Sequence, residues 1–396
     1  MFSEKINKLS QALSIYFNQI VYNLKEEGRD IITLSLGEAY FDIPLYDFNN
    51  LDLEKSHHYS SSRGTSGLRK KISEYYNKNY KTKIDPQHEI LISAGSKPLI
   101  FMALFSILNS RDEVIILEPA WLSYCEQIKL CGGEVKFINY KENIANIGKY
   151  LSKKSKIIIV NNPNNPAGKL YSKREILNLI NIAKKKNIWL IFDEAYSDFV
   201  EKTFISAYHF KEKYNKIIVI NSLSKNFGIS GWRLGYIIAE KNFIFQILKL
   251  NQHLLTCAPS ILMNYIEFYF TSLIKITKPQ IKKLIQKRKK IKKIMNKIGL
   301  KYLSGSSTFY FFINLEKAQS SLHDLCLYLL LKHNISIVPG EAYGTSTKKF
   351  VRISIGTETE ERIEEALRLI KNLEQKKIEK KEIANLLKIN NLQYYN

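Results

Sequence analysis

The sequence predicts an α/β fold in which a mostly parallel β-sheet is covered by helices on both faces. Runs of mainly apolar, β-branched residues occur at residues 113–117, 156–160, 189–192 and 216–220. These runs are continuous rather than alternating, which is typical of strands that are buried on both faces. Helical patterns separate them, and polar residues follow their carboxyl ends, where open α/β sheets bind ligands.

The composition argues against several classes of protein. The chain has 396 residues, which is enough for two packed domains. Its net charge is +23, but the excess lies mostly in lysines spread along the chain, so we expect no nucleic-acid partner. No apolar run approaches the ~20 residues of a membrane span, and the N-terminus has no secretory pattern. The four cysteines form no Cys-x-x-Cys pair, so we expect a cytoplasmic protein without a zinc site.

The first segments carry little chemistry of their own. Apolar residues at helical spacing predict a helix within residues 10–28 that ends at Gly28. Residues 31–36 read as a strand, and the loop at residues 37–44 has the sequence GEAYFDIP. Residues 57–69 read HHYSSSRGTSGLR; the two histidines have no third ligand at a suggestive spacing, so no metal site is predicted.

A candidate anion site follows. Residues 89–95 predict a strand that ends at Gly95, and Ser96 opens an apolar helix with Pro98 in its first turn. A strand, a Gly-Ser turn and a helix N-terminus offer free backbone N–H groups and the positive end of the helix dipole. This signal is weak when taken by itself, because any βα unit has such a turn.

Two more strands lead into polar groups. Residues 161–168 read NNPNNPAG, a stiff turn with side-chain amides, and a capping box at residues 172–175 begins the next helix. Asp193 follows the run at residues 189–192. A carboxylate at the end of a buried strand needs several donors or a cationic partner, such as a protonated pyridine nitrogen.

The strongest signal comes directly after the run at residues 216–220. Residues 221–235 read NSLSKNFGISGWRLG, which places Lys225 at a strand end and encloses Arg233 among three glycines. Glycine lets the backbone approach a ligand closely, and arginine binds phosphate with a planar fork. A lysine amine so placed suits a Schiff base with a phosphorylated aldehyde cofactor.

These motifs resemble those of the class I and II aminotransferases, which are pyridoxal-phosphate enzymes of fold type I, like aspartate aminotransferase. The resemblance covers about residues 5–373 in family order and includes PAWLSY at residues 119–124 and FVRIS at residues 350–354. Two positions depart from the usual pattern, because Ala39 and Ala167 stand where the family usually has proline and threonine.

The resemblance implies a role for each site residue. Lys225, Asp193 and Tyr196 form the implied catalytic set: Lys225 holds pyridoxal 5'-phosphate, Asp193 faces its ring nitrogen, and Tyr196 faces its phenolic oxygen. The implied cofactor-binding residues are Gly95, Ser96, Lys97, Trp121, Asn165, Asp193, Tyr196, Ser222, Lys225, Arg233 and Tyr59 of the partner subunit in a homodimer. The implied substrate-binding residues are Gly37, Asn165 and Arg352, of which Arg352 holds the α-carboxylate.

The C-terminal part predicts an α+β domain. A basic helix is expected at residues 281–298, strands at residues 308–315, 335–338 and 350–355, and a helix from Glu358. With the resemblance, the large cofactor-binding domain is expected to span residues 46–284. The small domain is expected to combine residues 1–45 and 285–376, and residues 377–396 are expected to be a basic tail.

The implied reaction is transfer of an amino group from an amino acid to a 2-oxo acid, in amino acid metabolism and biosynthesis. The alternative is a lyase, or a cyclase or synthase, of the same fold in specialised metabolism, because the same carbanion serves all of these reactions. A regulator that fuses this fold to a winged helix is not expected, because the residues before 10 leave no room for that domain. Arg63 has two open interpretations, a partner for a substrate side-chain carboxylate or a solvated arginine.

Overall fold

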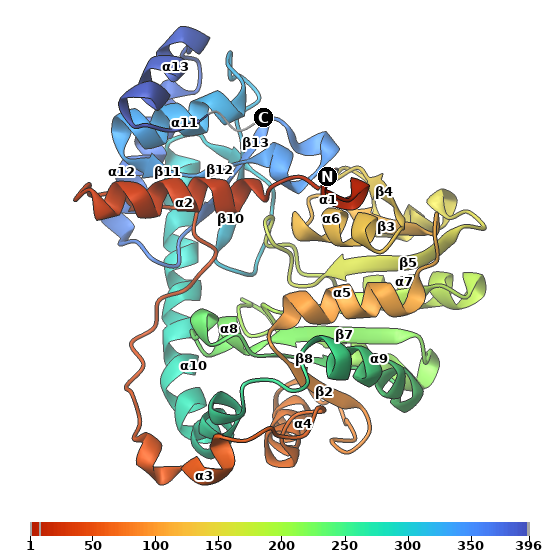
Figure 1. The fold of residues 1–396 in the computed structure, drawn as a ribbon. Helices are drawn as coiled ribbons and strands as arrows, with labels where there is room; N and C mark the ends of the chain where they lie inside the picture. Colours follow the sequence, from red (N-terminus) through yellow and green to blue (C-terminus); the bar gives the residue numbers. More distant parts are fainter. Residues whose placement is uncertain (1, 8, 394–396) are drawn as a thin grey trace.

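A computed structural model describes residues 2–7 and 9–393 of the chain, and its larger part is a mostly parallel sheet (Figure 1). In the described residues this sheet has seven strands in the order β2-β8-β7-β6-β5-β3-β4, of which β8 runs antiparallel to β2 and β7. The strands are β2 (Ile90–Ser93), β3 (Glu113–Leu117), β4 (Glu134–Ile138), β5 (Ser155–Asn161), β6 (Trp189–Asp193), β7 (Ile217–Ser222) and β8 (Gly235–Ile238). The predicted fold class is confirmed.

Helices cover both faces of this sheet. Along β5, Ile157 and Ile159 pack on one face against the first group of helices, whereas Ile158 and Val160 pack on the opposite face against the second group. The first group is α5 (Ser96–Ile107), α6 (Ser123–Leu130) and α9 (Lys241–Leu254), and the second is α4 (Ser66–Tyr80), α7 (Lys173–Lys186) and α10 (Ser260–Lys297). Each buried aliphatic side chain contributes about 1.5–3 kcal/mol, so this double burial explains the continuous apolar runs.

The small domain is built on an antiparallel sheet with the order β12-β13-β10-β9. Its strands are β9 (Lys301–Tyr302), β10 (Tyr310–Asn314), β12 (Val338–Pro339) and β13 (Phe350–Ser354), and its helices are α2 (Leu13–Glu26), α11 (Leu322–His333) and α12 (Glu360–Leu373). The N-terminal segment joins this domain, because β1 (Ile32–Thr33) pairs in parallel with β11 (Ile335–Ser336). Figure 1 shows α2 lying beside these strands.

Several short elements complete the described chain. They are α1 (Glu4–Asn7), α3 (Leu53–Ser56), α8 (Leu223–Asn226), η1 (Phe48–Asn50), η2 (Ile144–Tyr150), η3 (Ala207–Lys213), η4 (Ser230–Trp232), η5 (Gly340–Tyr343) and η6 (Thr345–Thr347). The helix at α7 begins with the predicted capping box, in which Ser172 and Glu175 satisfy each other's backbone N–H groups.

Three elements differ from the sequence prediction. The strand expected at residues 31–36 is reduced to the two residues of β1, because β11 offers only a short partner. The strand expected at residues 335–338 is divided between β11 and β12, which belong to different sheets because β11 pairs with β1 and β12 with β13. The basic helix expected at residues 281–298 is present as the second half of the 38-residue α10, which continues through Pro279 and connects the two domains in Figure 1. The basic tail, in which a short helix was considered possible, contains α13 (Lys380–Ile389) and is not solvated throughout, because Ile383 and Leu387 are buried in the small-domain core.

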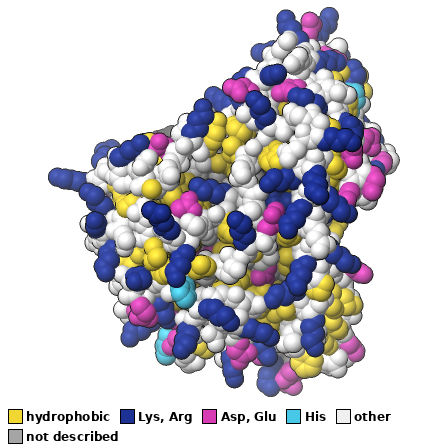
Figure 2. Space-filling view, turned by 180° about the vertical axis from the view of Figure 1, so that it is seen from behind, with side chains coloured by type: hydrophobic (Ala, Val, Ile, Leu, Met, Phe, Trp, Pro, Cys, Tyr) yellow, Lys and Arg dark blue, Asp and Glu magenta, His cyan; other side chains and the backbone are white. Residues whose placement is uncertain are grey.

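The surface carries its charge in a dispersed form. On the face shown in Figure 2, lysine and arginine side chains are scattered over the whole view, with aspartate and glutamate among them. The positive excess is therefore not concentrated in one patch on this face. No helix in the described ranges combines the length and apolar character that crossing a membrane requires.

Candidate active site

A cavity of about 220 Å³ lies where three neighbouring parallel strands, β5, β6 and β7, end. The predicted site residues that line it are Gly37, Ser96, Lys97, Trp121, Asn165, Asp193, Tyr196, Ser222, Lys225, Arg233 and Arg352. Residues that the sequence analysis did not select also line it, namely Ser14, Asn18, Asn161, Ala195, Ser224 and Tyr310. Both domains therefore contribute side chains to one polar cavity.

Lys225 reaches the cavity from α8, the short helix that begins directly after β7. Ser222 caps this helix by accepting a hydrogen bond from the Ser224 N–H at 3.1 Å. The Lys225 amine donates to the Gly37 carbonyl at 2.5 Å. Desolvation lowers the pKa of the Lys225 amine to about 8; the carboxylates of Glu38 and Asp193 oppose this shift, and the guanidinium groups of Arg352 and Arg233 add to it. A lysine with this pKa is a competent nucleophile near neutral pH.

An anion cradle lies beside Lys225. Arg233 donates to the Ser230 carbonyl at 2.7 Å and to the Ser224 hydroxyl at 3.4 Å, so its guanidinium is fixed. Gly95, with φ of +100°, precedes α5, and a Cβ atom there would lie 2.8 Å from an Arg233 nitrogen. Glycine is therefore required for the helix N-terminus and the guanidinium to meet. Ser96 and Ser222 line the same cavity, and the group suits a phosphate.

Asp193 is a buried carboxylate with two neutral donors. The Tyr124 hydroxyl donates to its Oδ2 at 2.5 Å, and the Ala195 N–H donates to its Oδ1 at 3.1 Å. Burial raises the pKa of the Asp193 carboxyl, and the hydrogen bond from Tyr124 opposes this shift. In the described part of the chain Asp193 forms no ion pair, so a protonated ring nitrogen supplied by a ligand would complete its surroundings.

Asn165 and Tyr196 lie together on another wall of the cavity. The Asn165 side-chain N–H donates to the Tyr196 hydroxyl at 3.4 Å, and its backbone N–H donates to Asn161 Oδ1 at 2.6 Å. The Tyr196 hydroxyl is also 3.0 Å from the Tyr310 hydroxyl. The buried Asn165 Oδ1 has no hydrogen-bond partner among the described residues. These groups suit a ligand with a phenolic oxygen.

Arg352 enters the cavity from β13 of the small domain and is 4% exposed. It donates through Nη2 to the Ser35 carbonyl. Its guanidinium lies 4.8 Å from the centre of the Tyr310 ring and 5.3 Å from that of Tyr343. A guanidinium held in this way offers its free edge to a carboxylate.

Lys97 and Trp121 form a further part of the wall. The Lys97 amine lies 5.2 Å from the centre of the Trp121 ring. Desolvation, with a smaller effect of Arg233, lowers the pKa of the Lys97 amine. Lys97 has no carboxylate partner within the described ranges, so an anionic ligand group could pair with it.

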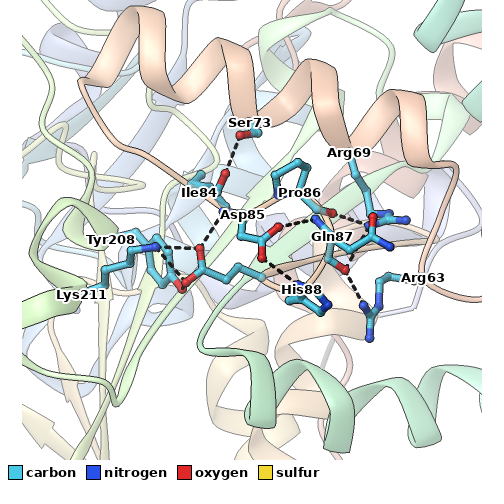
Figure 3. Close-up of polar contacts among 11 residues, drawn as sticks. Arg63, Arg69, Ser73, Ile84, Asp85, Pro86, Gln87, His88, Tyr208 and Lys211 are labelled. Carbon is cyan, nitrogen blue, oxygen red and sulfur yellow. Dashed lines mark hydrogen bonds and ion pairs between the residues drawn. The ribbon is translucent and has the colours of Figure 1, made fainter.

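The segment at residues 57–69, which contains Tyr59 and Arg63, lies outside the cavity lining. The Tyr59 side chain is 86% exposed. The Arg63 guanidinium donates to the Gln87 carbonyl at 2.5 Å, and Arg69 donates to the carbonyl groups of Pro86 and Gln87 (Figure 3). Arg63 therefore stabilises the turn that precedes β2 through this hydrogen bond.

The comparison with known families decides the assignment. The model of the family described as aminotransferase class I and II matches residues 29–370. The chain belongs to this family. It is a pyridoxal-phosphate-dependent aminotransferase, which transfers an amino group from an amino acid to a 2-oxo acid. The resemblance found in the sequence is confirmed.

Relatives of this aminotransferase extend over most of the chain. It is 28% identical to the aspartate aminotransferase of Thermotoga maritima, across 93% of this chain and 97% of that protein. It is 33% identical to the (5-formylfuran-3-yl)methyl phosphate transaminase of Methanocaldococcus jannaschii, across 89% and 94%. Among solved structures, MJ0684 from Methanococcus jannaschii superposes with a TM-score of 0.84 at 30% identity, across 94% of this chain and 100% of that chain; that protein is described as similar in its active site to kynurenine aminotransferases.

The residues in the cavity fit pyridoxal phosphate. The cradle that a Cβ at Gly95 would fill suits the phosphate, the buried carboxylate of Asp193 suits a protonated ring nitrogen, and the amine of Lys225 lies in the same cavity. The aminotransferase sequence motifs identified most of this set. Tyr310 and the residues of α2 were missed, because their positions depend on tertiary packing. Tyr124 lies in the quoted motif PAWLSY but was assigned no role.

Proposed function

We propose that Lys225 holds pyridoxal phosphate covalently and is the proton carrier of the aminotransferase reaction. The observation that carries this proposal is the amine of Lys225, with its pKa lowered to about 8, in one cavity with Asp193 and Arg233. When bound, the cofactor supplies a sink for the electrons released at the substrate α-carbon. Once free, the Lys225 amine takes the proton from that carbon and returns it, as general base and then as general acid.

The other residues hold the reacting groups in place. Arg233, Ser96, Ser222 and the backbone N–H groups after Gly95 bind the phosphate, as their common position in the cavity supports. Asp193 keeps the ring nitrogen protonated, and Asn165 with Tyr196 donates to the phenolic oxygen. Trp121, which lines the cavity, would pack against the ring. Arg352 binds the α-carboxylate with its fork, beside the loop of Gly37, so that the α-carbon is oriented over the ring.

We infer that the preferred amino acid has an acidic side chain. The Lys97 amine lies in the cavity opposite no carboxylate of the described chain, and a second carboxylate on the substrate would neutralise it. The names of the relatives support the same class, because those of Thermotoga maritima and Pyrococcus abyssi are aspartate aminotransferases. This role concerns the Lys97 side chain; its backbone N–H is still proposed to belong to the turn that binds the cofactor phosphate.

We propose that the active site is formed by both domains of one subunit and by a residue of a second subunit. We assign the large domain to residues 46–284 and the small domain to residues 1–45 and 285–376, to which the packing of α13 adds residues 380–389. We infer a homodimer in which Tyr59 of the partner subunit contacts the phosphate, which its 86% exposure supports. The four cysteines form no disulfide in the described structure, which supports a reducing compartment such as the cytoplasm.

Borohydride reduction followed by peptide mapping tests the central proposal. The cofactor adduct is expected on Lys225, and an adduct on another lysine would contradict the assignment. The acidic preference is tested by comparing Lys97→Met with the wild type on aspartate and alanine. The variant should lose much more kcat/KM on aspartate, and equal losses would remove the proposed pairing.

Mixed dimers test the shared site. Tyr59→Ala and Lys225→Ala subunits are each expected to be poorly active as homodimers. If Tyr59 serves its partner's cofactor, a mixed dimer contains one site with both residues intact, and activity returns on mixing. If Tyr59 serves its own subunit, no intact site forms and activity stays low. Sedimentation of the active wild type should show a dimer.

A further inference from the structure

Tyr310 occupies a position between two parts of the active site that the family motifs treat separately. It lies on β10 of the small domain and is fully buried. Its hydroxyl is 3.0 Å from the hydroxyl of Tyr196, which belongs to the large domain. Its ring lies under the guanidinium of Arg352, 4.8 Å from the ring centre. One side chain therefore touches both the proposed cofactor contact and the proposed carboxylate contact.

The direction of the hydroxyl hydrogen bond follows from the number of protons. The Tyr196 hydroxyl has one proton, which the proposed function directs to the phenolic oxygen of the cofactor. It must then accept from its neighbours, and these are the Asn165 side-chain N–H at 3.4 Å and the Tyr310 hydroxyl at 3.0 Å. Tyr310 is therefore the donor. A donor that is itself hydrogen-bonded in this way is strengthened, because successive hydrogen bonds polarise one another.

The backbone leaves room for this arrangement. A Cβ atom at Gly37 would lie 3.0 Å from the Tyr310 hydroxyl, so glycine there keeps the space beside the hydroxyl open. The charged groups that act on Tyr310 from neighbouring elements are Arg352 and Glu38. Neither accepts a hydrogen bond from its hydroxyl in the described structure, which leaves Tyr196 as the partner.

The ring of Tyr310 has a separate task. Arg352 is flanked by the rings of Tyr310 and Tyr343, and its Nη2 donates to the Ser35 carbonyl. Its buried Nε has no partner among the described residues. Aromatic faces attract a guanidinium and restrict its plane. The rings thus hold the fork of Arg352 in one orientation before a carboxylate arrives.

We propose that Tyr310 is a positioning residue with two separable roles: its hydroxyl strengthens the hydrogen bond from Tyr196 to the cofactor, and its ring orients Arg352 toward the substrate carboxylate. The inference rests on the proposed roles of Tyr196 and Arg352. It involves no covalent step. Tyr310→Phe removes the first role and keeps the second, whereas Tyr310→Leu removes both.

The first role is tested on the cofactor-loaded enzyme without substrate. The absorbance of the cofactor bound to Lys225 is measured as a function of pH. This titration reports the proton affinity of the nitrogen atom that joins Lys225 to the cofactor. A weaker donor to the phenolic oxygen raises this affinity, so Tyr310→Phe should raise it about 2- to 10-fold. Tyr196→Phe should raise it at least as much, and the Tyr196→Phe/Tyr310→Phe double variant should go no further. Tyr302→Phe is the control, because its hydroxyl donates to Asn296 at 2.8 Å and lies outside the cavity lining; it should leave the titration unchanged.

The second role is tested by steady-state kinetics. Tyr310→Leu should raise KM for the amino acid about 2- to 30-fold above that of Tyr310→Phe, which keeps the aromatic face. An unchanged titration in Tyr310→Phe, or additive effects in the double variant, would overturn the role of the hydroxyl. Equal KM values for the Phe and Leu variants would overturn the role of the ring. Failure of the proposed function is distinguishable, because the wild type would then show no borohydride adduct on Lys225.

Discussion

The hydroxyl of Tyr124 lies 2.5 Å from Oδ2 of Asp193 and donates a hydrogen bond to it. Tyr124 is 1% exposed and belongs to α6, whereas Asp193 ends β6. The same turn before α6 presents Trp121 to the cavity, with its ring edge-on to that of Tyr124 at 5.2 Å. One short segment therefore positions both the residue proposed to lie against the cofactor ring and the carboxylate proposed to face its nitrogen.

Removing this hydroxyl should weaken catalysis while leaving the fold intact. Tyr124→Phe leaves Asp193 with one fewer donor in a buried site, so its carboxylate is less well held and its pKa rises further. We expect a fall of about 3- to 30-fold in kcat and a similar loss of cofactor affinity. Steady-state kinetics and cofactor titration measure these values. Tyr22→Phe, which changes a half-exposed hydroxyl, is the control; a comparable loss there would contradict the specific role of Tyr124.

The pH dependence of cofactor attachment reports the state of Lys225. Because its pKa is lowered to about 8, the apoprotein should bind pyridoxal phosphate with a rate that rises around that pH, well below the 10.5 of an ordinary lysine. Glu38 raises the pKa of Lys225, so Glu38→Gln should move the midpoint to lower pH. Glutamine can still accept the hydrogen bond from Ser230. Stopped-flow absorbance gives the midpoint, and Glu54→Gln, at an exposed position, should not move it.

The sequence predicted the proposed reactive and cofactor-binding residues better than the other residues that line the cavity. Lys225 and Asp193 were selected because each follows a strand whose apolar run is visible, and the carboxyl ends of parallel strands meet at one edge. Asn165 was selected through the resemblance of its turn to the family motif. Ser14 and Asn18 line the cavity from α2, which reaches it through the pairing of β1 with β11. Such a contact depends on tertiary packing, and no local pattern in α2 signals it.

The same distinction holds for the fold. The capping box at Ser172 was predicted because it is a local pattern, and the structure contains it. The burial of α13 was not predicted, because its apolar residues alternate with lysines and do not reveal which surface they contact. In the structure Ile383 and Leu387 of α13, with Ile378 just before it, are buried in the core. Arg29 adds a long-range tie, donating to Asn390 at 2.9 Å. A segment with few buried apolar residues cannot be told from a solvated tail by its sequence, because the surface on which it packs is formed by distant parts of the chain.

A buried carboxyl next to the active site should make stability depend on pH. Glu194 is fully buried, accepts from the Ala207 N–H at 2.7 Å through Oε1, and has no partner for Oε2 among the described residues. Burial raises the pKa of Glu194 from 4.5 to about 8. The folded state thus keeps a proton that the unfolded chain releases above pH 4.5. The stability contributed by this proton is fully present below that pH and is lost as the pH rises to about 8.

Glu194→Gln removes this titration. The free energy of unfolding of the wild type should fall, relative to the variant, by up to about 1.4 kcal/mol per pH unit between about pH 5 and pH 8. Urea unfolding of both proteins across this range measures the difference. Glu212→Gln, which alters an exposed carboxyl, should show no such trend. A constant difference between Glu194→Gln and the wild type would refute the raised pKa.

Arg63 should contribute to stability rather than to substrate choice. Its guanidinium donates to the Gln87 carbonyl at 2.5 Å and is not part of the cavity lining. Arg63→Ala should lower the free energy of unfolding by about 0.5–1.5 kcal/mol, the usual net value of one hydrogen bond. Its kcat/KM should change by the same factor for acidic and neutral amino acids. A selective loss on acidic substrates would restore Arg63 as a carboxylate partner.

Arg352 offers the sharpest test of how the substrate is oriented. Its guanidinium is held by the Ser35 carbonyl and flanked by the rings of Tyr310 and Tyr343, so its orientation is set before substrate binds. Lysine cannot reproduce this planar fork. Arg352→Lys should therefore lose about 2–4 kcal/mol of transition-state stabilisation, or about 30- to 1,000-fold in kcat/KM. Cofactor affinity should change little, because Arg352 is not a proposed phosphate ligand.

The measurement that tests the role of Arg352 compares an accepted amino acid with its decarboxylated amine, in the wild type and in Arg352→Lys. The amine should be a poor substrate of the wild type and should lose much less in the variant, because it has no carboxylate for the fork to hold. Equal proportional losses for the two compounds would show that Arg352 acts through the structure of the site and not through the α-carboxylate.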